Sequence, residues 1–116
     1  MEYFCGQEAE LFVFYRIPKA LITDKRFKNM RCEAKLLYGL LLDKIGLSCK
    51  NGWLDKQGRA FVYYSINSIM GDLGCAHNKA ENLLAELEHF DLLRRKRQGL
   101  GKPDLLYLLK FENRIS

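Results

Sequence analysis

The chain has 116 residues, of which 48% are hydrophobic, enough for one buried core and too few for two comfortable domains. Its 19 Lys and Arg residues outnumber its 14 Asp and Glu residues, giving a formal net charge of +5, and the cations gather late in the chain. No apolar run approaches the roughly 20 residues that cross a bilayer, and the N-terminus lacks the pattern of a signal peptide, so we expect a cytoplasmic protein without membrane contact.

The first half of the chain predicts a strand, a helical turn and a long core helix. Leu11–Ile17 is rich in aromatic and β-branched residues and ends at Pro18, which predicts a short strand. Pro18 suits the start of a helical turn through Lys19–Ile22. Apolar residues spaced three and four apart predict the main core helix from Arg31 to Ile45, ended by Gly46. Its apolar face is broad, so we expect neighbouring elements or a second subunit to cover it.

A loop is predicted from Ser48 to Gly58, followed by a strand over Arg59–Tyr64. The loop contains the lone Trp53, for which two roles fit. It could stack on a nucleobase, but a single aromatic beside a glycine turn more often pins its loop to the core, and we favour that role.

Two short helices separated by a glycine follow. Ser65 is placed to cap a helix over Ile66–Leu73, Gly74 forms the turn, and the second helix buries an apolar stripe. Its outward first turn carries side chains that can read base edges, because Asn suits adenine while His and Lys suit guanine or phosphate. These candidate recognition residues are His77, Asn78, Lys79 and Asn82. A merely solvated helix face is the alternative interpretation.

A basic hairpin ends the pattern. A strand over Leu92–Gln98 and an apolar strand over Leu105–Leu109 flank a flexible link with a cation near its tip. Cations on an edge strand can serve only to prevent aggregation, but beside a helix-turn-helix they favour phosphate contact. The candidate residues are Arg94, Arg95, Lys96, Arg97, Gln98 and Lys102. The sequence therefore predicts an α+β winged helix-turn-helix with an N-terminal β extension, which binds double-stranded DNA.

Three segments carry a more specific pattern: Phe14–Leu21, Glu33–Lys44, and Arg95–Pro103. Together with Trp53 and its neighbours, they resemble the N-terminal domain of plasmid replication initiator protein A from low-GC Gram-positive bacteria. The resemblance implies sequence-specific binding to repeated sites in a plasmid replication origin. It also implies a homodimer joined by N-terminal β structure, and a separate C-terminal part that meets other replication proteins.

The resemblance also sets expected domain limits and departures. We expect an N-terminal extension over residues 1–13, the winged-helix DNA-binding domain over residues 14–113 and a tail over residues 114–116. Cys32 and Ala76 stand where serine is common in such sequences, and Asp104 stands where asparagine is common. Ala76 matters most, because alanine cannot cap the predicted recognition helix.

Catalysis finds little support in the sequence. The chain has no phosphate-cradling GxxxxGK[ST], no HExxH and no recognisable nucleophile setting, so we expect no enzymatic activity. Its cysteines are far apart and only two histidines accompany them, so no metal site or cofactor is expected. Two other functions fit the same residues. One is a winged-helix transcriptional regulator, and the other is a protein-interaction module whose basic hairpin meets an acidic partner.

Overall fold

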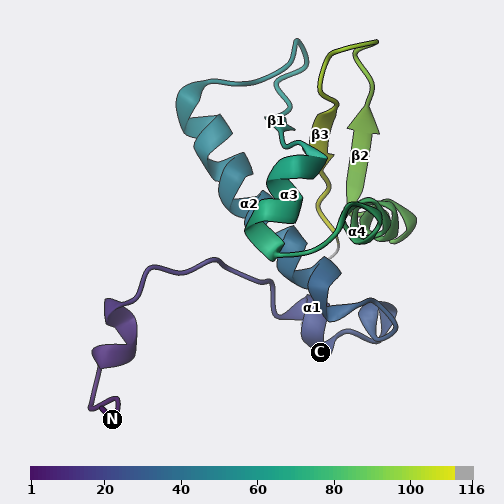
Figure 1. The fold of residues 1–116 in the computed structure, drawn as a ribbon. Coiled ribbons are helices and arrows are strands. Elements are labelled where there is room, and N and C mark those ends of the chain that lie inside the picture. Colours follow the sequence, from purple (N-terminus) through teal and green to yellow (C-terminus); the bar gives the residue numbers. More distant parts are fainter. Residues whose placement is uncertain (112–116) are drawn as a thin grey trace.

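A computed structural model describes residues 1–111, and the statements below concern that part of the chain. Four α-helices, two short 3-10 helices (η) and three strands follow one another within it (Figure 1). In chain order they are η1 (Glu8–Leu11), α1 (Ala20–Thr23), η2 (Lys25–Phe27), α2 (Cys32–Asn51), β1 (Val62–Tyr63), α3 (Ile66–Leu73), α4 (His77–His89), β2 (Leu93–Lys96) and β3 (Leu105–Leu108).

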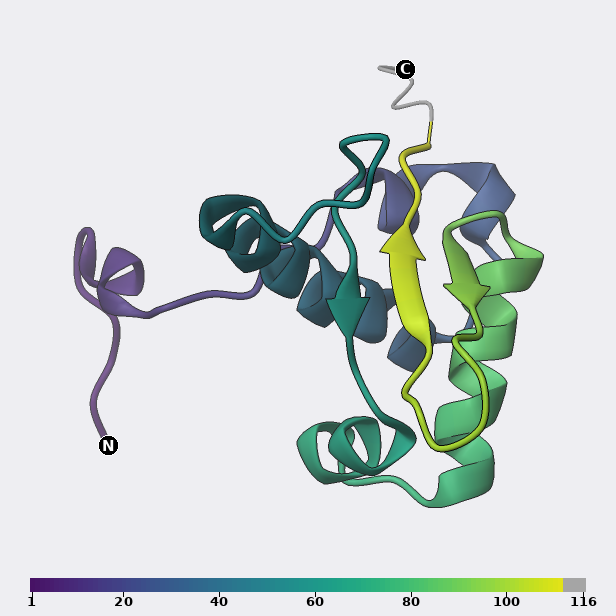
Figure 2. The same ribbon diagram turned by 90° about the horizontal axis from the view of Figure 1, so that it is seen from above.

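The three strands form one antiparallel sheet in the order β1-β3-β2. Leu106 of β3 lies between Val62 of β1 and Arg95 of β2, which fixes the register on both sides of the central strand. Seen from above, the sheet lies in front of α2 and α4 (Figure 2). A long helix, a strand, two helices and a strand pair in this order make a winged helix, so the predicted α+β winged-helix class is confirmed. The predicted N-terminal β extension is not, because no strand precedes Val62 in the described chain.

The core lies between the inner face of the sheet and the three longer helices. The predicted apolar stripes of α2 and α4 face it, and full burial of a leucine or isoleucine side chain contributes about 1.5–3 kcal/mol. The fully buried large apolar side chains are Leu21, Leu37, Leu41, Ile69, Leu83, Leu84, Leu87, Leu92 and Leu106. Tyr38 adds a long-range tie, because its hydroxyl donates to the carbonyl of Leu109 at 3.0 Å.

Helix α2 does not end at Gly46, so that prediction is wrong. It continues to Asn51, and Gly52 ends it with a left-handed φ of 74°. A glycine within a helix costs only about 1 kcal/mol, which is too little to end it, whereas Gly52 ends the helix by donating its N–H to the carbonyls of Ser48 and Cys49. Ser48, which was predicted to begin a loop, is buried in the last turn of the helix with 1% of its surface exposed.

The strand predicted over Leu11–Ile17 is also absent. Leu11 ends η1, and the residues after it run to Pro18 without pairing to any strand of the described chain. A strand is stable only beside another strand, and a single subunit offers this segment none. Residues 1–15 form an arm that projects away from the rest of the molecule (Figures 1 and 2), and Val13 on it is completely exposed.

The loop after α2 departs from expectation in two ways. Strand β1 spans only Val62–Tyr63 rather than Arg59–Tyr64, and a single bridge between Leu54 and Ala60 closes the preceding turn. Trp53 is 53% exposed, so it does not pin the loop to the core as predicted.

Two further observations concern the chain as a whole. Of the predicted domain limits, the end at residue 113 and the tail over residues 114–116 lie outside the described residues. Among residues 1–111, no helix has the length and apolar character of a membrane span.

Candidate nucleic-acid interface

The helix-turn-helix forms where the sequence predicted it. The hydroxyl of Ser65 accepts the backbone N–H of Ser68 at 3.0 Å and so caps α3. Gly74 takes a left-handed φ of 66° and donates its N–H to Met70, which ends that helix. Ala76 precedes α4 and, as expected for alanine, makes no side-chain hydrogen bond to it. The first turn of α4 therefore lacks the side-chain acceptor that α3 has.

Helix α4 presents a polar stripe to solvent, opposite its buried face. Asn78, Asn82, Ala85 and His89 are exposed along this stripe, at the three- and four-residue spacing of one helix face. His77 is exposed at the start of the helix. Three of the four predicted recognition residues are thus free to meet a ligand.

Lys79 is the exception among them, because its ammonium contacts the Glu33 carboxylate at the start of α2. This hydrogen bond lowers the pKa of Glu33 below its ordinary value. The pair ties the first turn of α4 to α2. The structure thus gives Lys79 an intramolecular partner that sequence reasoning did not foresee.

The acidic side chains of α4 that border the stripe are also paired. Arg95 of β2 donates to Glu88 at 2.9 Å and to Glu81 at 3.2 Å. On the other flank, the backbone N–H of Arg31 donates to Glu86 at 2.7 Å. These contacts offset the negative charge that would otherwise repel a polyanion from the stripe.

The six predicted wing residues separate by face and by partner. Arg95 shares the inner face of β2 with the buried Leu93, whereas Arg94 and Lys96 lie on the outer face, since successive side chains of a strand alternate. Within the described chain, neither of these two outer cations has a carboxylate within ion-pair distance, and the same holds for Arg97 and Lys102.

Gln98 has a structural contact within the wing. Its side-chain amide donates to the carbonyl of Pro103 at 2.8 Å across the base of the wing loop. Gly99 and Gly101 in that loop have φ values of 119° and 77°, which glycine adopts without strain. The loop therefore holds a defined turn that carries Lys102 at its exposed end.

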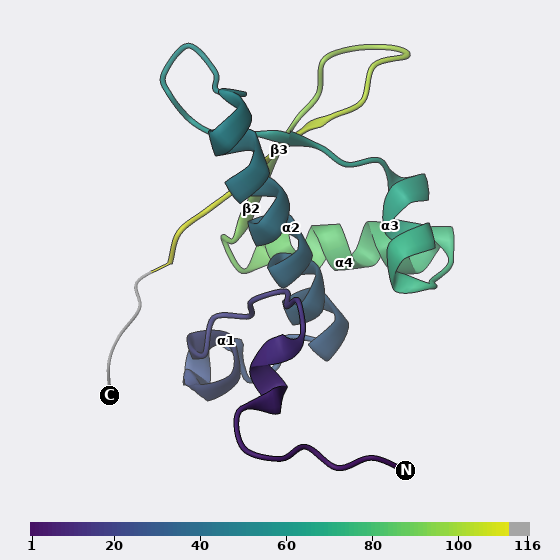
Figure 3. The ribbon, with the colours of Figure 1, turned by 90° about the vertical axis from the view of Figure 1, so that its left-hand side faces the viewer.

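The base of the wing adjoins α4 through Arg95, and the wing loop rises away from the helix (Figure 1). Figures 2 and 3 both place the wing loop on the side of the molecule where α3 ends and α4 begins. A shallow hollow between them is lined by Glu81 of α4 and by Arg95, Arg97 and Leu100 of the wing. Glu81, which flanks the exposed stripe, and Arg97 of the wing therefore line the same hollow.

The outer face of the sheet holds a separate cluster that sequence reasoning missed. Asp55 accepts hydrogen bonds from Arg59 at 2.8 Å and from the Tyr107 hydroxyl at 3.0 Å, and the Arg59 guanidinium lies over the Tyr107 ring. This cluster fixes the turn after α2 to β3. The only sequence signal was the glycine turn near Asp55, which does not indicate contact with a strand some fifty residues later.

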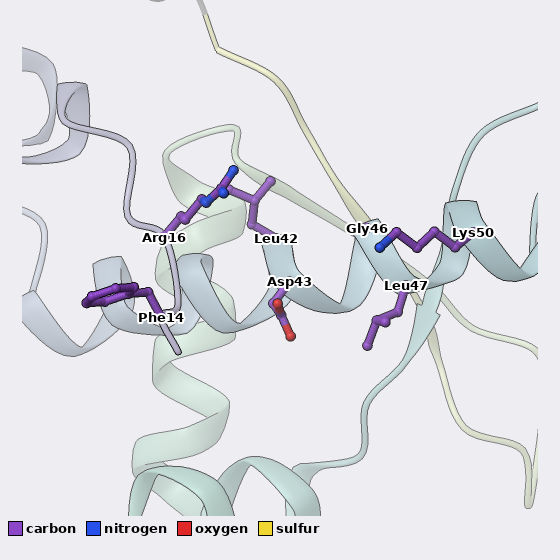
Figure 4. A pocket seen from close by; sticks show the side chains of 7 residues that line it. All are labelled: Phe14, Arg16, Leu42, Asp43, Gly46, Leu47 and Lys50. Carbon is purple, nitrogen blue, oxygen red and sulfur yellow. The ribbon is translucent and has the colours of Figure 1, made fainter. Parts of the chain in front are cut away.

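A second hollow lies between the N-terminal arm and α2 (Figure 4). Phe14 and Arg16 form one wall, and Leu42, Asp43 and Leu47 form the other. Leu47 and Phe14 are both exposed. This hollow does not adjoin the α4 stripe and contains no group of metal-binding residues, and none occurs elsewhere in residues 1–111.

Comparison with known proteins finds a matching family and similar solved structures. Residues 13–116 match the family model described as Replication initiator protein A (RepA) N-terminus. The chain is 28% identical over 106 residues to a 41 kDa protein of Lactobacillus helveticus, which covers 86% of this chain and 30% of that protein. The chain thus spans about a third of the length of this relative.

Three solved structures are similar over nearly the whole chain. A structure of a Rep–DNA complex has 38% identity and a TM-score of 0.80, covering 98% of this chain and 88% of that one. The N-terminal domain of a DNA-binding protein has 39% identity and a TM-score of 0.77, and the match covers 95% of this chain and 84% of that one. An MDR initiator has 34% identity and a TM-score of 0.77, and the match covers 97% of this chain and 89% of that one.

Proposed function

This chain belongs to the family of replication initiator protein A N-termini, and from that premise we propose that it is the DNA-binding domain of a replication initiator. It binds double-stranded DNA in a sequence-specific manner at a plasmid replication origin. Its role is binding rather than catalysis. A plasmid origin lies in the bacterial cytoplasm, so the protein acts there.

One observation carries the proposal: an exposed polar stripe on α4 adjoins a wing whose outermost cations have no partner in residues 1–111. A helix about 10–12 Å wide fits the major groove, which is about 12 Å wide. Unpaired cations beside an inserted helix meet the flanking phosphates, and phosphate neutralisation dominates affinity. The similarity to a Rep–DNA complex at 38% identity supports the same ligand.

The residues divide by role in this proposal. Asn78 and Asn82 read base edges from the centre of the stripe, with His77 beside them. Arg97 and Lys102 contact the sugar-phosphate backbone from the wing, and Lys96 and Arg94 add charge from its outer face.

Three of the predicted site residues act through others. Arg95 positions the wing against α4, Lys79 positions α4 against α2, and Gln98 shapes the wing loop. Their side chains already have partners within the chain, so direct DNA contact would require those bonds to break. They are positioning residues in this proposal.

We also propose that the domain works as a homodimer. Phe4, Phe12 and Phe14 of the arm form an edge-to-face series and remain largely exposed. Apolar exposure of this extent on a projecting arm is typical of a segment covered by a partner. A second copy would complete the strand that the sequence predicts over Leu11–Ile17, and two wings and two α4 helices would then read spaced half-sites. Other replication proteins would be met by parts of the initiator beyond this domain.

Selection of bound sequences from a random duplex pool tests the proposal directly. The expected result is enrichment of one motif, found as repeats in a plasmid origin and protected there in a footprint. Enrichment of promoter sequences instead would indicate a transcriptional regulator. A folded protein without salt-dependent duplex binding would contradict DNA binding altogether.

A further inference from the structure

The segment Lys25–Arg31 forms a second basic border of α4. It contains Lys25, Arg26, Lys28 and Arg31 and no acidic residue. All four are exposed, whereas Phe27 and Met30 between them are buried. The alternation of exposed cations with buried apolar residues fixes the segment to the core and leaves its charge outside. None of its cations belongs to the wing or to the recognition residues predicted above.

Contacts place this segment along α4, toward its C-terminal half. The Phe27 ring lies 6.2 Å from the ring of Phe90, which directly follows the helix. The backbone N–H of Arg31 donates to Glu86 at 2.7 Å, and the Arg31 Nε lies 3.6 Å from the same carboxylate. Two attachment points therefore hold the segment beside α4, with Lys28 exposed between them.

This border lies across α4 from the wing. Glu88 contacts Arg95 of the wing, whereas Glu86 contacts Arg31. At 3.6 residues per turn, two consecutive even-numbered positions lie about 160° apart around a helix, so these two carboxylates mark opposite flanks of α4. His89 and Asn82 lie on the exposed arc between them. The stripe is thus bordered by cations on both sides.

We propose that Lys25 and Lys28, supported by Arg31, form a second phosphate-binding border opposite the wing. The inference rests on the proposed function. A helix inserted in the major groove has one phosphate backbone on each side, and the wing reaches only one of them. Lys25 and Lys28 have no ion-pair partner in the described chain, so their ammonium groups are available to phosphate oxygens. Arg26 is not included, because it already binds Asp24.

The double variant Lys25→Ala/Lys28→Ala tests this border on the selected duplex. Each phosphate contact contributes about 0.9 to the slope of log affinity against log salt, so the slope should fall in magnitude by about 2. Arg97→Ala/Lys102→Ala should reduce it by a similar amount. Combining the two pairs should reduce it by about 4, because the two borders contact different strands of the groove.

A matched control removes two exposed cations far from this border, Lys50 in the last turn of α2 and Lys56 in the loop that follows it. Lys50→Ala/Lys56→Ala makes the same change in net charge, and it should leave the slope close to that of the unchanged protein. All variants alter exposed side chains, and circular dichroism melting confirms that each is folded. Phosphate-ethylation interference provides a second readout, with interfering phosphates on both sides of the groove expected.

The possible results separate this inference from the proposed function. If the unchanged protein and the wing variant behave as expected but Lys25→Ala/Lys28→Ala matches the control, the second border is wrong and DNA binding stands. If ethylation interferes on only one side of the groove, the second border is likewise wrong. If the unchanged protein shows no salt-dependent duplex binding, both proposals fail.

Discussion

Arg95 on β2 donates a hydrogen bond to Glu88 on α4 at 2.9 Å, and the same guanidinium reaches Glu81 at 3.2 Å. The contact joins the wing to the proposed recognition helix. It also means that one of the four consecutive cations is used inside the molecule. Arg95 therefore sets where the wing stands relative to the α4 stripe, while its neighbours Arg94, Lys96 and Arg97 have no ion-pair partner in the described chain.

Replacing Arg95 with alanine should reduce stability. Hydrogen bonds to charged groups contribute about 1.5–3 kcal/mol each when buried, and exposure of the side chain reduces this, so we expect a loss of about 1–2 kcal/mol in the free energy of unfolding. The side chain is 22% exposed. Urea denaturation measures the change. Arg97 is exposed and has no partner in the described chain, so Arg97→Ala should change the free energy of unfolding by no more than about 0.5 kcal/mol. Equal losses for the two variants would contradict the role of Arg95 in holding the wing against α4.

The same residue gives a prediction for DNA binding. Arg95→Lys keeps the charge but cannot bridge two carboxylates as a planar guanidinium does, so it should not restore affinity. Because Arg95 acts through the position of the wing, its loss should weaken binding without lowering the salt slope. Arg97→Ala should lower that slope by about 1. Fluorescence anisotropy over a series of salt concentrations measures the affinity and the salt slope of both alanine variants. A lower slope for Arg95→Ala would indicate a direct phosphate contact.

Asn78 and Asn82 should determine sequence preference. Alanine at either position should cost about 1–3 kcal/mol on the selected site and little on random duplex, because a bidentate base contact is lost. Arg97→Ala should weaken binding to both duplexes alike, since phosphates carry no sequence information. Competition between the two duplexes measures the ratio of the affinity for the selected site to the affinity for random duplex. A uniform loss for Asn78→Ala would assign that residue to the backbone instead.

The uncapped start of α4 predicts a stabilising substitution. Ala76→Ser supplies the missing acceptor and should raise the free energy of unfolding by about 1 kcal/mol. Ser65→Ala should lower it by about the same amount, because Ser65 already caps α3 through the N–H of Ser68. Thermal melting of the two variants provides the comparison. If Ala76→Ser does not raise the free energy of unfolding, another group already accepts hydrogen bonds from the backbone N–H groups in the first turn of α4.

Much of the fold was predictable because its signals are local. Ser65, Gly74 and the spacing of Leu83, Leu84 and Leu87 specify two helices and the turn between them, and the structure has all of these features. The wing was predictable as well, since a run of cations followed by an apolar strand permits few other arrangements. These features depend on residues within a few positions of one another.

The errors concern features decided by distant residues. Gly46 and Gly52 both resemble helix ends in sequence, and only Gly52 takes the left-handed φ that ends α2. Leu11–Ile17 has strand composition, but a strand also requires a neighbouring edge. The role of Arg95 depends on the register of β2 against β3 and on the rotation of α4, neither of which the order of residues reveals.

The two helical glycines of α2 should respond differently to alanine. A Cβ at Gly46 meets nothing within 4 Å, so Gly46→Ala should raise the free energy of unfolding by about 1 kcal/mol. A Cβ at Gly39 would lie 3.1 Å from both the carbonyl oxygen of Arg16 and the Cγ1 of Ile17, so these two residues would have to shift. The gain at Gly39 should therefore be smaller or reversed. Urea midpoints test this, and an equal gain at both sites would show that Arg16 and Ile17 do not restrict the space at Gly39.

The last prediction concerns acid stability and depends on Asp55. Hydrogen bonds from the Arg59 and Gln57 N–H groups, the Arg59 guanidinium and the Tyr107 hydroxyl converge on its carboxylate. Led by the backbone bond from Arg59, they lower the pKa of Asp55 from 3.8 to about 2. Between these values the unfolded chain binds the proton first, so this contribution is present above pH 3.8 and is lost as pH falls toward about 2.

Substitution isolates this contribution from that of the other carboxyl groups. Asp55→Asn cannot ionise, so the stability difference between the unchanged protein and this variant should be largest above about pH 5 and shrink as the pH falls through about 2. Asp43→Asn is the matched control, because Asp43 is exposed and has no hydrogen-bond partner in the described chain. The difference in the free energy of unfolding between Asp43→Asn and the unchanged protein should stay small at every pH in the series. Urea unfolding at a series of pH values measures both, and a constant difference for Asp55→Asn would mean that the folded state does not favour the ionised carboxylate.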